Sequence, residues 1–343
     1  MYEKYKSFAS NPLLLNIMLL TFNNNASIPD KLNDFYEQAF STLFNMHDAT
    51  KDAYVRDIRT GLSCEDFKLL FAYMCFKSYF RDEYEFSEVK LRKYIQESKD
   101  KFGEMQFTID EFQEDLTMSV CMLMKDGLNY RFVHRSFQEY FAAWYTCKLT
   151  DDVQQKLLTN WLKESNDVNT DSYFTMLYNM QSEKVNKIIL APGIREIKNK
   201  IDEYGFGMHF LQFLFRGLST RKIIKNIEDG KIKEVYKLSL VIKQKYYCSI
   251  LVMTCRLNGY PYNEINEDEH EKIAFKLAKI KEEKDEEREI TFDEAVKIVG
   301  EENLYCALEW FKKQLDFSFD ILNKCESNSI GRKKKVASIL DEL

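Results

Sequence analysis

The sequence is poor in the two residue types that tight turns need. Its 343 residues include only 4 Pro and 11 Gly, whereas an all-β fold of this length needs many tight turns. Apolar residues make up 45% of the chain, and 26 Phe and 20 Tyr supply bulky core side chains. This composition excludes a disordered chain and predicts a globular, mainly α-helical protein of about two domains.

The chain also lacks a basic excess, a long apolar run and a metal-binding cysteine pattern. Its net charge of −6 gives no general attraction to nucleic acid or to an anionic membrane. No apolar run reaches the roughly 20 residues of a membrane span. The eight cysteines form no Cys-x-x-Cys pair, which argues against a zinc site and favours reduced thiols. We therefore expect a cytoplasmic protein with no membrane association and no metal site.

Catalytic motifs are missing as well. No Gly-x-x-x-x-Gly-Lys-Ser/Thr loop occurs, so the sequence has no phosphate-binding loop of a nucleotide hydrolase. Asp293 follows charged residues rather than an apolar strand, so it fits the first turn of a helix better than a magnesium site. His47, His209 and His270 lack a two-ligand spacing, and we interpret them as surface or packing residues. We predict no catalytic residue, and we do not expect this chain alone to be an enzyme.

Residues 61–150 contain clear helix starts. We predict three helices that begin at Ser63, Ser87 and Thr108 and end near residues 80, 101 and 120. Asp126-Gly127 then suits a two-residue type I′ turn between two strands, residues 121–125 and 128–134. Three helices followed by a hairpin are typical of a winged helix.

The second predicted strand runs directly into a helix at His134. Up to this residue, alternate positions are apolar, and from Phe137 onward apolar residues recur every three or four positions. Ser136 and Glu139 are predicted to cap the helix. Packing explains the aromatic residues, but it gives no reason for a histidine at position 134.

A winged helix often binds DNA through its third helix. The corresponding segment here, residues 109–116, carries four carboxylates: Asp110, Glu111, Glu114 and Asp115. Carboxylates repel a phosphate backbone, whereas DNA-reading helices carry Arg and Lys. We therefore disfavour nucleic acid as a partner, and we keep a DNA-binding regulator only as a third hypothesis.

The two ends of the chain are predicted to be helical. Asn11 and Pro12 form a favourable helix start, and the apolar residues 13–20 predict a helix that is buried all round. A second helix begins at Pro29. Residues 151–343 are predicted to form an α-helical array, with helices over residues 151–163, 170–190, 194–203, 206–217, 219–228, 231–258, 265–288, 291–299 and 302–323. The basic segment 221–245 is interpreted as a solvent-exposed helix face, although it could also receive an acidic partner or nucleic acid.

Two stretches resemble one known family. Phe132-Val-His134-Arg-Ser-Phe137-Gln-Glu139-Tyr-Phe141-Ala-Ala is similar to the end of the winged-helix domain of NACHT-family NTPases, the STAND or NLR-like signalling proteins of innate immunity and antiphage defence. Asn11-Pro12-Leu-Leu-Leu15, Ile28-Pro29 and Phe35-Tyr36-Glu37 resemble the latter half of the family's first helical domain. The resemblance implies three parts: residues 1–60 from helical domain 1, a winged helix over 61–150, and helical domain 2 with sensor-like helices over 151–343.

The resemblance also implies a nucleotide site. In the family, the matching histidine contacts the β-phosphate of bound ADP and the matching proline packs against adenine, so His134 and Pro12 are the candidate cofactor-binding residues. Walker A and Walker B motifs do not occur in this sequence. We therefore expect ADP or ATP to bind only in combination with a nucleotide-binding core, and the chain to come from a truncated reading frame or a split gene.

Two functions follow from these observations. The first is nucleotide-state sensing and protein interaction within a NACHT-type signalling NTPase in defence, with the nucleotide-binding core, further copies of itself and a trigger as partners. The alternative is a stand-alone α-helical adaptor that does not depend on nucleotide.

Overall fold

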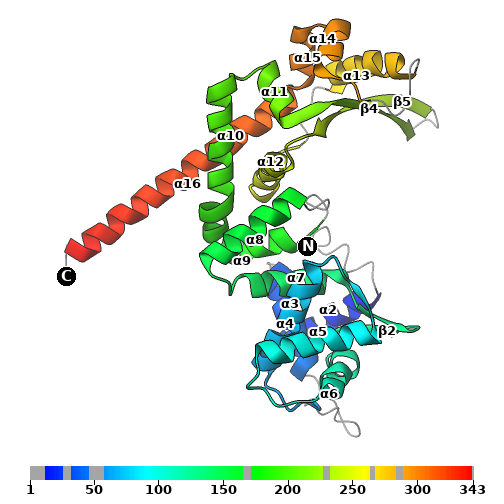
Figure 1. Ribbon diagram of the computed structural model, residues 1–343, viewed down its shortest axis with the longest axis vertical. Coiled ribbons are helices and arrows are strands. Elements are labelled where there is room, and N and C mark those ends of the chain that lie inside the picture. The colour runs from blue at the N-terminus through cyan, green and yellow to red at the C-terminus, as the bar shows by residue number, and fades with distance from the viewer. Residues whose placement is uncertain are drawn as a thin grey trace. The chain divides into compact units, whose positions relative to one another are not determined.

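The computed structural model describes residues 12–25, 32–45, 58–164, 171–226, 232–262, 267–282 and 289–341, and most of them are helical (Figure 1). The prediction of a mainly α fold is confirmed. The chain divides into two compact units: unit 1 contains residues 1–154 and 170–182, and unit 2 contains residues 155–169 and 183–343.

Unit 1 combines helices with one small antiparallel sheet. Its helices are α2 (Pro12–Asn25), α3 (Leu32–Asn45), α4 (Cys64–Tyr79), α5 (Glu88–Lys101), α6 (Ile109–Glu114), the π-helix η2 (Asp115–Ser119) and α7 (Arg135–Thr146). The sheet has the strand order β1-β3-β2, with β1 (Glu85–Ser87), β2 (Leu123–Asp126) and β3 (Asn129–Phe132). Helices α8 (Asp151–Glu164) and α9 (Tyr173–Val185) are divided between the two units.

The three predicted helix starts in this unit are confirmed. Ser63 accepts a hydrogen bond from the backbone N–H of Asp66, and Ser87 accepts one from that of Lys90. Thr108 begins α6 with a complete capping box. These side chains satisfy N–H groups that have no partner within the helix, which explains why the boundaries are legible in the sequence. The assignment of a winged helix to these elements stays a prediction.

The turn between β2 and β3 differs from the prediction by one residue. Asp126 pairs with Asn129, so Gly127 and Leu128 are the two central residues of the turn. Gly127 has φ +61°, whereas among the described non-glycine residues only Asp82 and Cys121 have positive φ. A positive φ at the first central position alone is typical of a type II′ turn, not of the predicted type I′ turn.

Aromatic side chains form the core of unit 1. Phe141 of α7 lies 4.9 Å from Phe71 of α4 and 5.1 Å from Phe40 of α3, measured between ring centroids. All three rings are fully buried. Burying each such side chain contributes roughly 1.5–3 kcal/mol, so α7 is held mainly by its aromatic face.

Helix α2 forms as predicted, but it is not buried all round. Ile17 is 4% exposed, whereas Leu15, Leu19 and Phe22 are 37%, 52% and 47% exposed. The three exposed residues recur at spacings of four and three, so they share one face of the helix. The uniformly apolar sequence gave no indication of which side would lie against α3.

Unit 2 contains the remaining elements. These are the π-helix η3 (Asn186–Leu190), α10 (Ala191–Tyr204), α11 (Met208–Leu214), β4 (Phe215–Asn226), β5 (Ile232–Ile242), α12 (Lys245–Leu257), α13 (Glu267–Glu282), α14 (Phe292–Val299), α15 (Glu301–Ala307) and α16 (Glu309–Asp341). Asp293 lies in the first turn of α14, as predicted. The last predicted helix is wrong in extent, because α15 ends at Ala307 and α16 continues well beyond residue 323.

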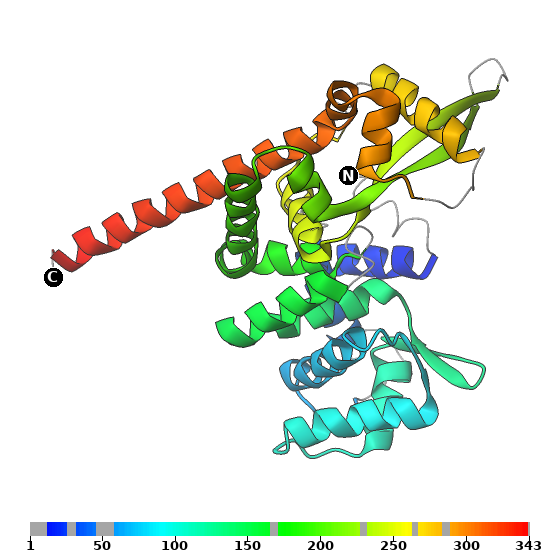
Figure 2. The ribbon, with the colours of Figure 1, turned by 45° about the horizontal axis from the view of Figure 1, so that its top comes forward.

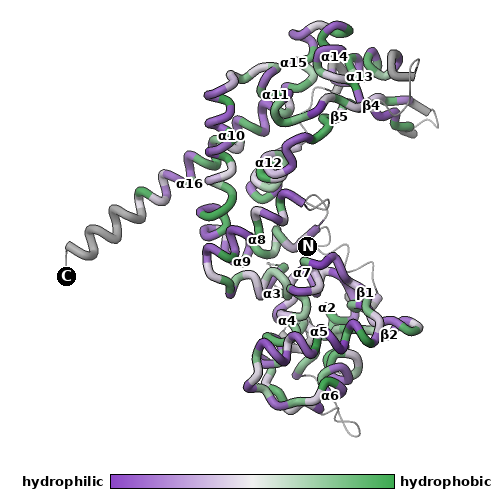
Figure 3. Tube along the Cα trace, viewed as in Figure 1, coloured by the Kyte–Doolittle hydropathy of each residue, from purple (hydrophilic) through white to green (hydrophobic). Residues whose placement is uncertain are grey.

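The predicted helix over 219–228 and the first part of the predicted helix over 231–258 are wrong, because β4 and β5 form an antiparallel pair there (Figure 1). Hydrophilic and hydrophobic residues are mixed along both strands (Figure 3). In β5, burial alternates from Tyr236 to Ser239: Tyr236 and Leu238 are buried and Lys237 and Ser239 are exposed, while Val235 before them is buried as well. This is a period of two, which the basic residues and the three-residue spacing of Val235 and Leu238 obscured. The basic segment therefore lies largely on strands and not on a helix face.

Helix α13 packs along this pair of strands (Figures 1 and 2). The backbone N–H of Leu238 donates to Nε2 of His270 at 3.2 Å, and Nδ1 of the same ring lies 3.3 Å from the carbonyl oxygen of Ala307. A backbone N–H can only donate, so Nε2 is the acceptor and Nδ1 carries the proton that Ala307 accepts. The interpretation of His270 as a packing residue is confirmed.

Strand β4 also approaches residue 290 closely. Leu218 and Ile290 exchange backbone hydrogen bonds of 2.8 and 2.9 Å. A Cβ atom added to the neighbouring Gly217 would lie 2.4 Å from the carbonyl oxygen of Ile290. A glycine is required at position 217 because the backbone of β4 and the backbone at Ile290 are too close to leave room for a side chain.

We expect Gly217→Ala to lower the free energy of unfolding of unit 2 by about 1–3 kcal/mol, since the added methyl group forces the two backbone segments apart. Urea denaturation followed by circular dichroism measures the change. Gly331→Ala is the matched control, because Gly331 is exposed on α16 with nothing within 4 Å of the added Cβ atom. The control should be neutral or more stable, and equal stability of both variants would contradict the prediction.

Candidate functional site

His134 is the N-cap residue of α7. Its backbone is extended, with φ −155° and ψ 137°, and its Nδ1 atom accepts a hydrogen bond of 3.2 Å from the backbone N–H of Ser136. The hydroxyl oxygen of Ser136 lies 2.5 Å from the same nitrogen. The histidine therefore has a structural role that the sequence pattern did not reveal.

The predicted cap of this helix is wrong. Ser136 is the second residue of α7 and not its cap, and Glu139 is buried in the helix. The Ser-x-x-Glu pattern predicted a capping box, but an imidazole nitrogen two residues earlier took the place of the serine oxygen. Histidine is not among the usual capping residues, so residue preference alone could not find it.

The cap determines which nitrogen of His134 carries the proton. Because the Ser136 N–H donates to Nδ1, that nitrogen must keep its lone pair, and the neutral ring is protonated on Nε2. Burial lowers the pKa of His134 below its usual value, since a charged imidazolium loses hydration. At neutral pH the side chain is therefore uncharged and has one N–H donor. Such a ring can donate one hydrogen bond to an anionic oxygen.

Tyr36 of α3 lies beside this cap. Its ring packs edge-on against Phe137 at 5.2 Å and stacks on Tyr140 at 5.1 Å. Burial raises the pKa of Tyr36 well above its usual value, so the phenol stays protonated.

Glu37, the next residue of α3, contacts another part of α7. Its carboxylate accepts a 2.7 Å hydrogen bond from the hydroxyl group of Tyr140 and pairs with Lys68. The side chain of Lys68 is only 5% exposed, and its ammonium group lies 4.5 Å from the ring centroid of Trp144. The structure thus brings residues 36 and 37, from one stretch of the family resemblance, against the helix that carries the other.

The first turn of α7 is also held by charged groups. Nε of Arg135 lies 3.4 Å from a carboxylate oxygen of Glu139, and Nη2 lies 3.8 Å from Asp171. Asp171 in turn accepts hydrogen bonds from the Tyr79 hydroxyl at 2.8 Å and the Tyr173 backbone N–H at 2.6 Å. Both carboxylates are buried, so this network satisfies charges that would otherwise be costly.

The second candidate residue, Pro12, is the exposed first residue of α2. The hydrogen bonds that define the His134 cap involve Ser136 and not Pro12. The structure therefore gives His134 a defined chemical state, while the expected adenine contact of Pro12 stays a prediction.

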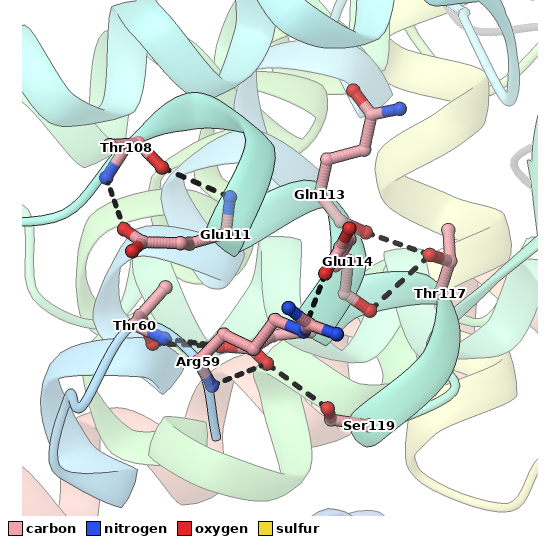
Figure 4. A network of polar contacts seen from close by, with 9 residues as sticks. Arg59, Thr60, Thr108, Glu111, Gln113, Glu114, Thr117 and Ser119 are labelled. Atoms are coloured by element: carbon pink, nitrogen blue, oxygen red, sulfur yellow. Dashed lines mark hydrogen bonds and ion pairs between the residues drawn. The ribbon is translucent and has the colours of Figure 1, made fainter. Parts of the chain in front are cut away.

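The acidic third helix is shown in Figure 4. Asp115 is fully buried, and its carboxylate accepts hydrogen bonds from the backbone N–H groups of Arg59 and Thr60 and from the hydroxyls of Thr60 and Ser119, at 2.9–3.0 Å. Asp115 is thus a buried carboxylate with four hydrogen-bond donors, not a charge on the protein surface. Asp115 therefore does not belong to an acidic surface of this helix; it anchors the preceding segment through Arg59 and Thr60.

The other three carboxylates have local partners. Glu114 pairs with Arg59 at 2.5 Å, and Glu111 completes the capping box with Thr108 (Figure 4). Asp110 pairs with Arg92. These interactions explain the acidic residues by local structure, without a nucleic acid.

Other kinds of site are not apparent in the described part of the chain. Its residues contain no group of three or more His, Cys, Asp and Glu side chains that could hold a metal ion. All eight cysteines are free thiols. None of the described helices is long and apolar enough to cross a membrane.

Comparison with known proteins connects the chain with the NACHT family. Residues 178–343, just under half of the chain, match the model of the Short NACHT-associated C-Terminal domain, family 7. Searches of curated proteins and of solved structures gave no match. The matched region contains nearly all of unit 2. It begins after the motif around His134, so the two indications of a NACHT association come from different residues.

We expect the free energy of unfolding to fall as the pH drops below about 6.5, the usual pKa of histidine. Folding lowers the pKa of His134, so below this pH the unfolded chain binds a proton that the folded chain does not, and protonation of Nδ1 removes the cap. Urea denaturation at pH 7.5 and 5.5 measures the loss. In His134→Asn, which keeps a capping acceptor but does not titrate, the loss should be smaller. The same pH dependence in both proteins would show that His134 does not contribute.

Proposed function

We propose that this chain is the C-terminal part of a NACHT-type signalling NTPase and that His134 senses the nucleotide state. The observation that carries the proposal is the hydrogen bond from the Ser136 N–H to Nδ1 of His134, since it makes Nε2 a donor. The family resemblance around His134 and the NACHT-associated match over residues 178–343 support the same association.

Residues of this chain would contribute one contact to the nucleotide. Bound ADP would supply a β-phosphate oxygen as acceptor, and His134 would donate to it through Nε2. A hydrogen bond to a charged group contributes about 1.5–3 kcal/mol, or roughly a 10- to 100-fold change in affinity. That is enough to bias a two-state equilibrium between a resting and an active arrangement.

Through the contacts of α7, a change at His134 would affect the other helices of unit 1. The helix that begins after His134 holds α3 through Tyr140 and Glu37, and it holds the segment at Asp171 through Arg135. Loss of the phosphate contact would therefore act on a helix that is held by two partly buried polar contacts and an aromatic face. Release of α7 is the step that we propose to permit oligomerisation.

The nucleotide-binding core would come from another segment of the same protein or from a separate chain, because a phosphate-binding loop does not occur in this sequence. We assign to unit 2 the detection of a trigger in antiphage or innate-immune defence. Its partners would be the core, further copies of itself and that trigger.

The second candidate function is a helical adaptor without nucleotide dependence. It is favoured by the structural role of His134 as a cap, which gives the histidine a reason to be present without any ligand. The exposed apolar face of α2, formed by Leu15, Leu19 and Phe22, would suit a protein partner in either case.

A cap-preserving variant separates the two functions. In the chain joined to a NACHT-type nucleotide-binding core, we expect His134→Ala and His134→Asp to lower ADP affinity by about 10- to 100-fold, measured by titration calorimetry. Aspartate keeps the cap but cannot donate to a phosphate and repels it. His134→Asp should therefore retain the melting temperature of the parent, while His134→Ala loses the cap.

His209→Ala, a histidine substitution in unit 2, serves as the control and should leave ADP affinity unchanged. Unchanged ADP affinity and unchanged signalling in both His134 variants would overturn the proposal and favour the adaptor.

A further inference from the structure

The strands β4 and β5 form a two-stranded ribbon, and helix α13 covers one of its faces (Figures 1 and 2). Tyr236 lies on the covered face, because its ring is 5.2 Å from that of Phe275 of α13, measured between centroids. Successive side chains of a strand point to opposite faces, so Lys237 and its register partner Arg221 lie on the other face. Both are exposed. We call this the basic face of the ribbon.

Basic residues stand opposite each other twice along this ribbon. Arg221 is paired with Lys237, and Lys225 is paired with Lys233 four residues away along both strands. An even spacing assigns both pairs to the same face. Like charges that are directly opposite each other destabilise a sheet, so the folded chain gains no stability from these pairs. They indicate a partner that supplies negative charge.

The single carboxylate of the ribbon belongs to the covered face. Glu234 is the only acidic residue in the sequences of β4 and β5, and it pairs with Lys222 at 2.8 Å. Lys222 is the register partner of Tyr236, so this ion pair lies on the same side as α13. Within the part of the chain that the structure describes, Arg221 and Lys237 have no such ion pair. The basic face therefore keeps its positive charge.

We infer that the basic face of the ribbon binds double-stranded DNA through the phosphate groups of the DNA backbone. DNA would then be the chemical class of the trigger that unit 2 is proposed to detect, and in this respect the inference rests on the proposed function. The contact itself requires neither a bound nucleotide nor His134.

A polyanion suits this face better than an apolar partner does. Its exposed side chains are charged or polar: Arg221, Lys237 and Ser239. Between the two basic pairs, Ile223 is half-buried and Val235 is 7% exposed. The described part of the face thus offers hydrogen-bond donors and positive charge but little apolar area, whereas the core of a protein interface or a bilayer would have to bury apolar side chains.

The shape of the ribbon favours B-form DNA among the nucleic acids. Two paired strands lie about 4.8 Å apart, and such a ribbon fits into the roughly 12 Å wide major groove of B-form DNA. The major groove of an A-form RNA helix is deep and narrow and does not admit it. Because each strand carries basic residues on this face, both borders of the groove would have a cation for their phosphates.

The net charge of −6 does not oppose this contact. Exposed charges that are further apart than the Debye length, about 8 Å at physiological salt, are largely screened from each other. A phosphate at the ribbon therefore responds to the basic pairs beside it. The acidic segment 109–116, which argued against a DNA-binding winged helix, belongs to unit 1, whereas the ribbon belongs to unit 2.

Fluorescence anisotropy of the full chain with a labelled DNA duplex of two helical turns tests the inference. We expect a Kd of about 10⁻⁴–10⁻⁶ M near physiological salt, the range of binding through phosphates alone. The slope of log Kobs against log salt concentration should be about −2 to −4, because each phosphate contact contributes about −0.9. A chain that binds no DNA even at low salt would overturn the inference.

We expect Arg221→Gln/Lys237→Gln to weaken binding by roughly 10- to 100-fold at about 0.1 M salt and to make the slope less negative by about 2, since two phosphate contacts are lost. Each single substitution should change the slope by about 1, so either one carries the test alone. The melting temperature should not fall, because the double substitution removes a like-charge pair.

Lys272→Gln/Lys276→Gln is the matched control. It removes the same two positive charges from exposed positions of α13, the helix that covers the other face. Affinity and slope should stay unchanged. An equal loss in both double variants, or no loss in the ribbon variant, would overturn the inference. RNA duplex binding as tight as DNA binding, or displacement of DNA by polyglutamate at equal charge concentration, would also reject a site for DNA.

Measurements on the chain joined to a nucleotide-binding core distinguish this inference from the proposed function. DNA that binds the ribbon without changing ADP affinity or signalling would uphold the DNA site and reject DNA as the trigger. Absence of DNA binding would reject the site, while the ADP affinities of the His134 variants would still decide the role of that histidine.

Discussion

A helix whose first turn is buried must satisfy its free N–H groups without water, and α7 is such a helix. Every residue from Ser136 to Ala143 is buried. An unsatisfied N–H group in that position costs about 1–3 kcal/mol, so the protein itself has to supply the acceptor. The imidazole of His134 does so, and the charged network around Arg135 satisfies the side chains of the same turn. The fold of unit 1 depends on this arrangement because α7 lies at the centre of its aromatic core.

The polar contacts of α7 specify its position more closely than its aromatic face does. Rings of similar size can exchange neighbours at small cost, whereas an ion pair with one buried partner tolerates few geometries. Glu37 and Lys68 illustrate this, since the lysine is almost fully buried between a carboxylate and the ring of Trp144. Removing one partner of such a pair leaves an uncompensated charge. α3, α4 and α7 are therefore fixed together by Glu37, Lys68 and Tyr140.

The sequence predicted what is encoded locally and missed what depends on distant contacts. Ser63, Ser87 and Thr108 are standard capping residues, so the helix starts were found. The strand β1 is three residues long, too short for a periodic pattern. The strands β4 and β5 carry lysines at exposed positions, and only the packing of Tyr236 against Phe275 of α13 shows which residues form their apolar face. The cap at His134 was missed because the predicted capping box used ordinary residues in an ordinary pattern.

The structural role of His134 does not compete with a role in nucleotide sensing, because the two roles use different atoms. The cap occupies Nδ1 as an acceptor, and a phosphate contact needs Nε2 as a donor. A serine or an aspartate at position 134 could cap the helix, but neither side chain has an N–H donor for a phosphate. The neutral imidazole of His134 combines an acceptor for the helix, Nδ1, with a donor on its other ring nitrogen, Nε2. The sequence left position 134 without a structural explanation, and the structure supplies one that is compatible with the proposed phosphate contact.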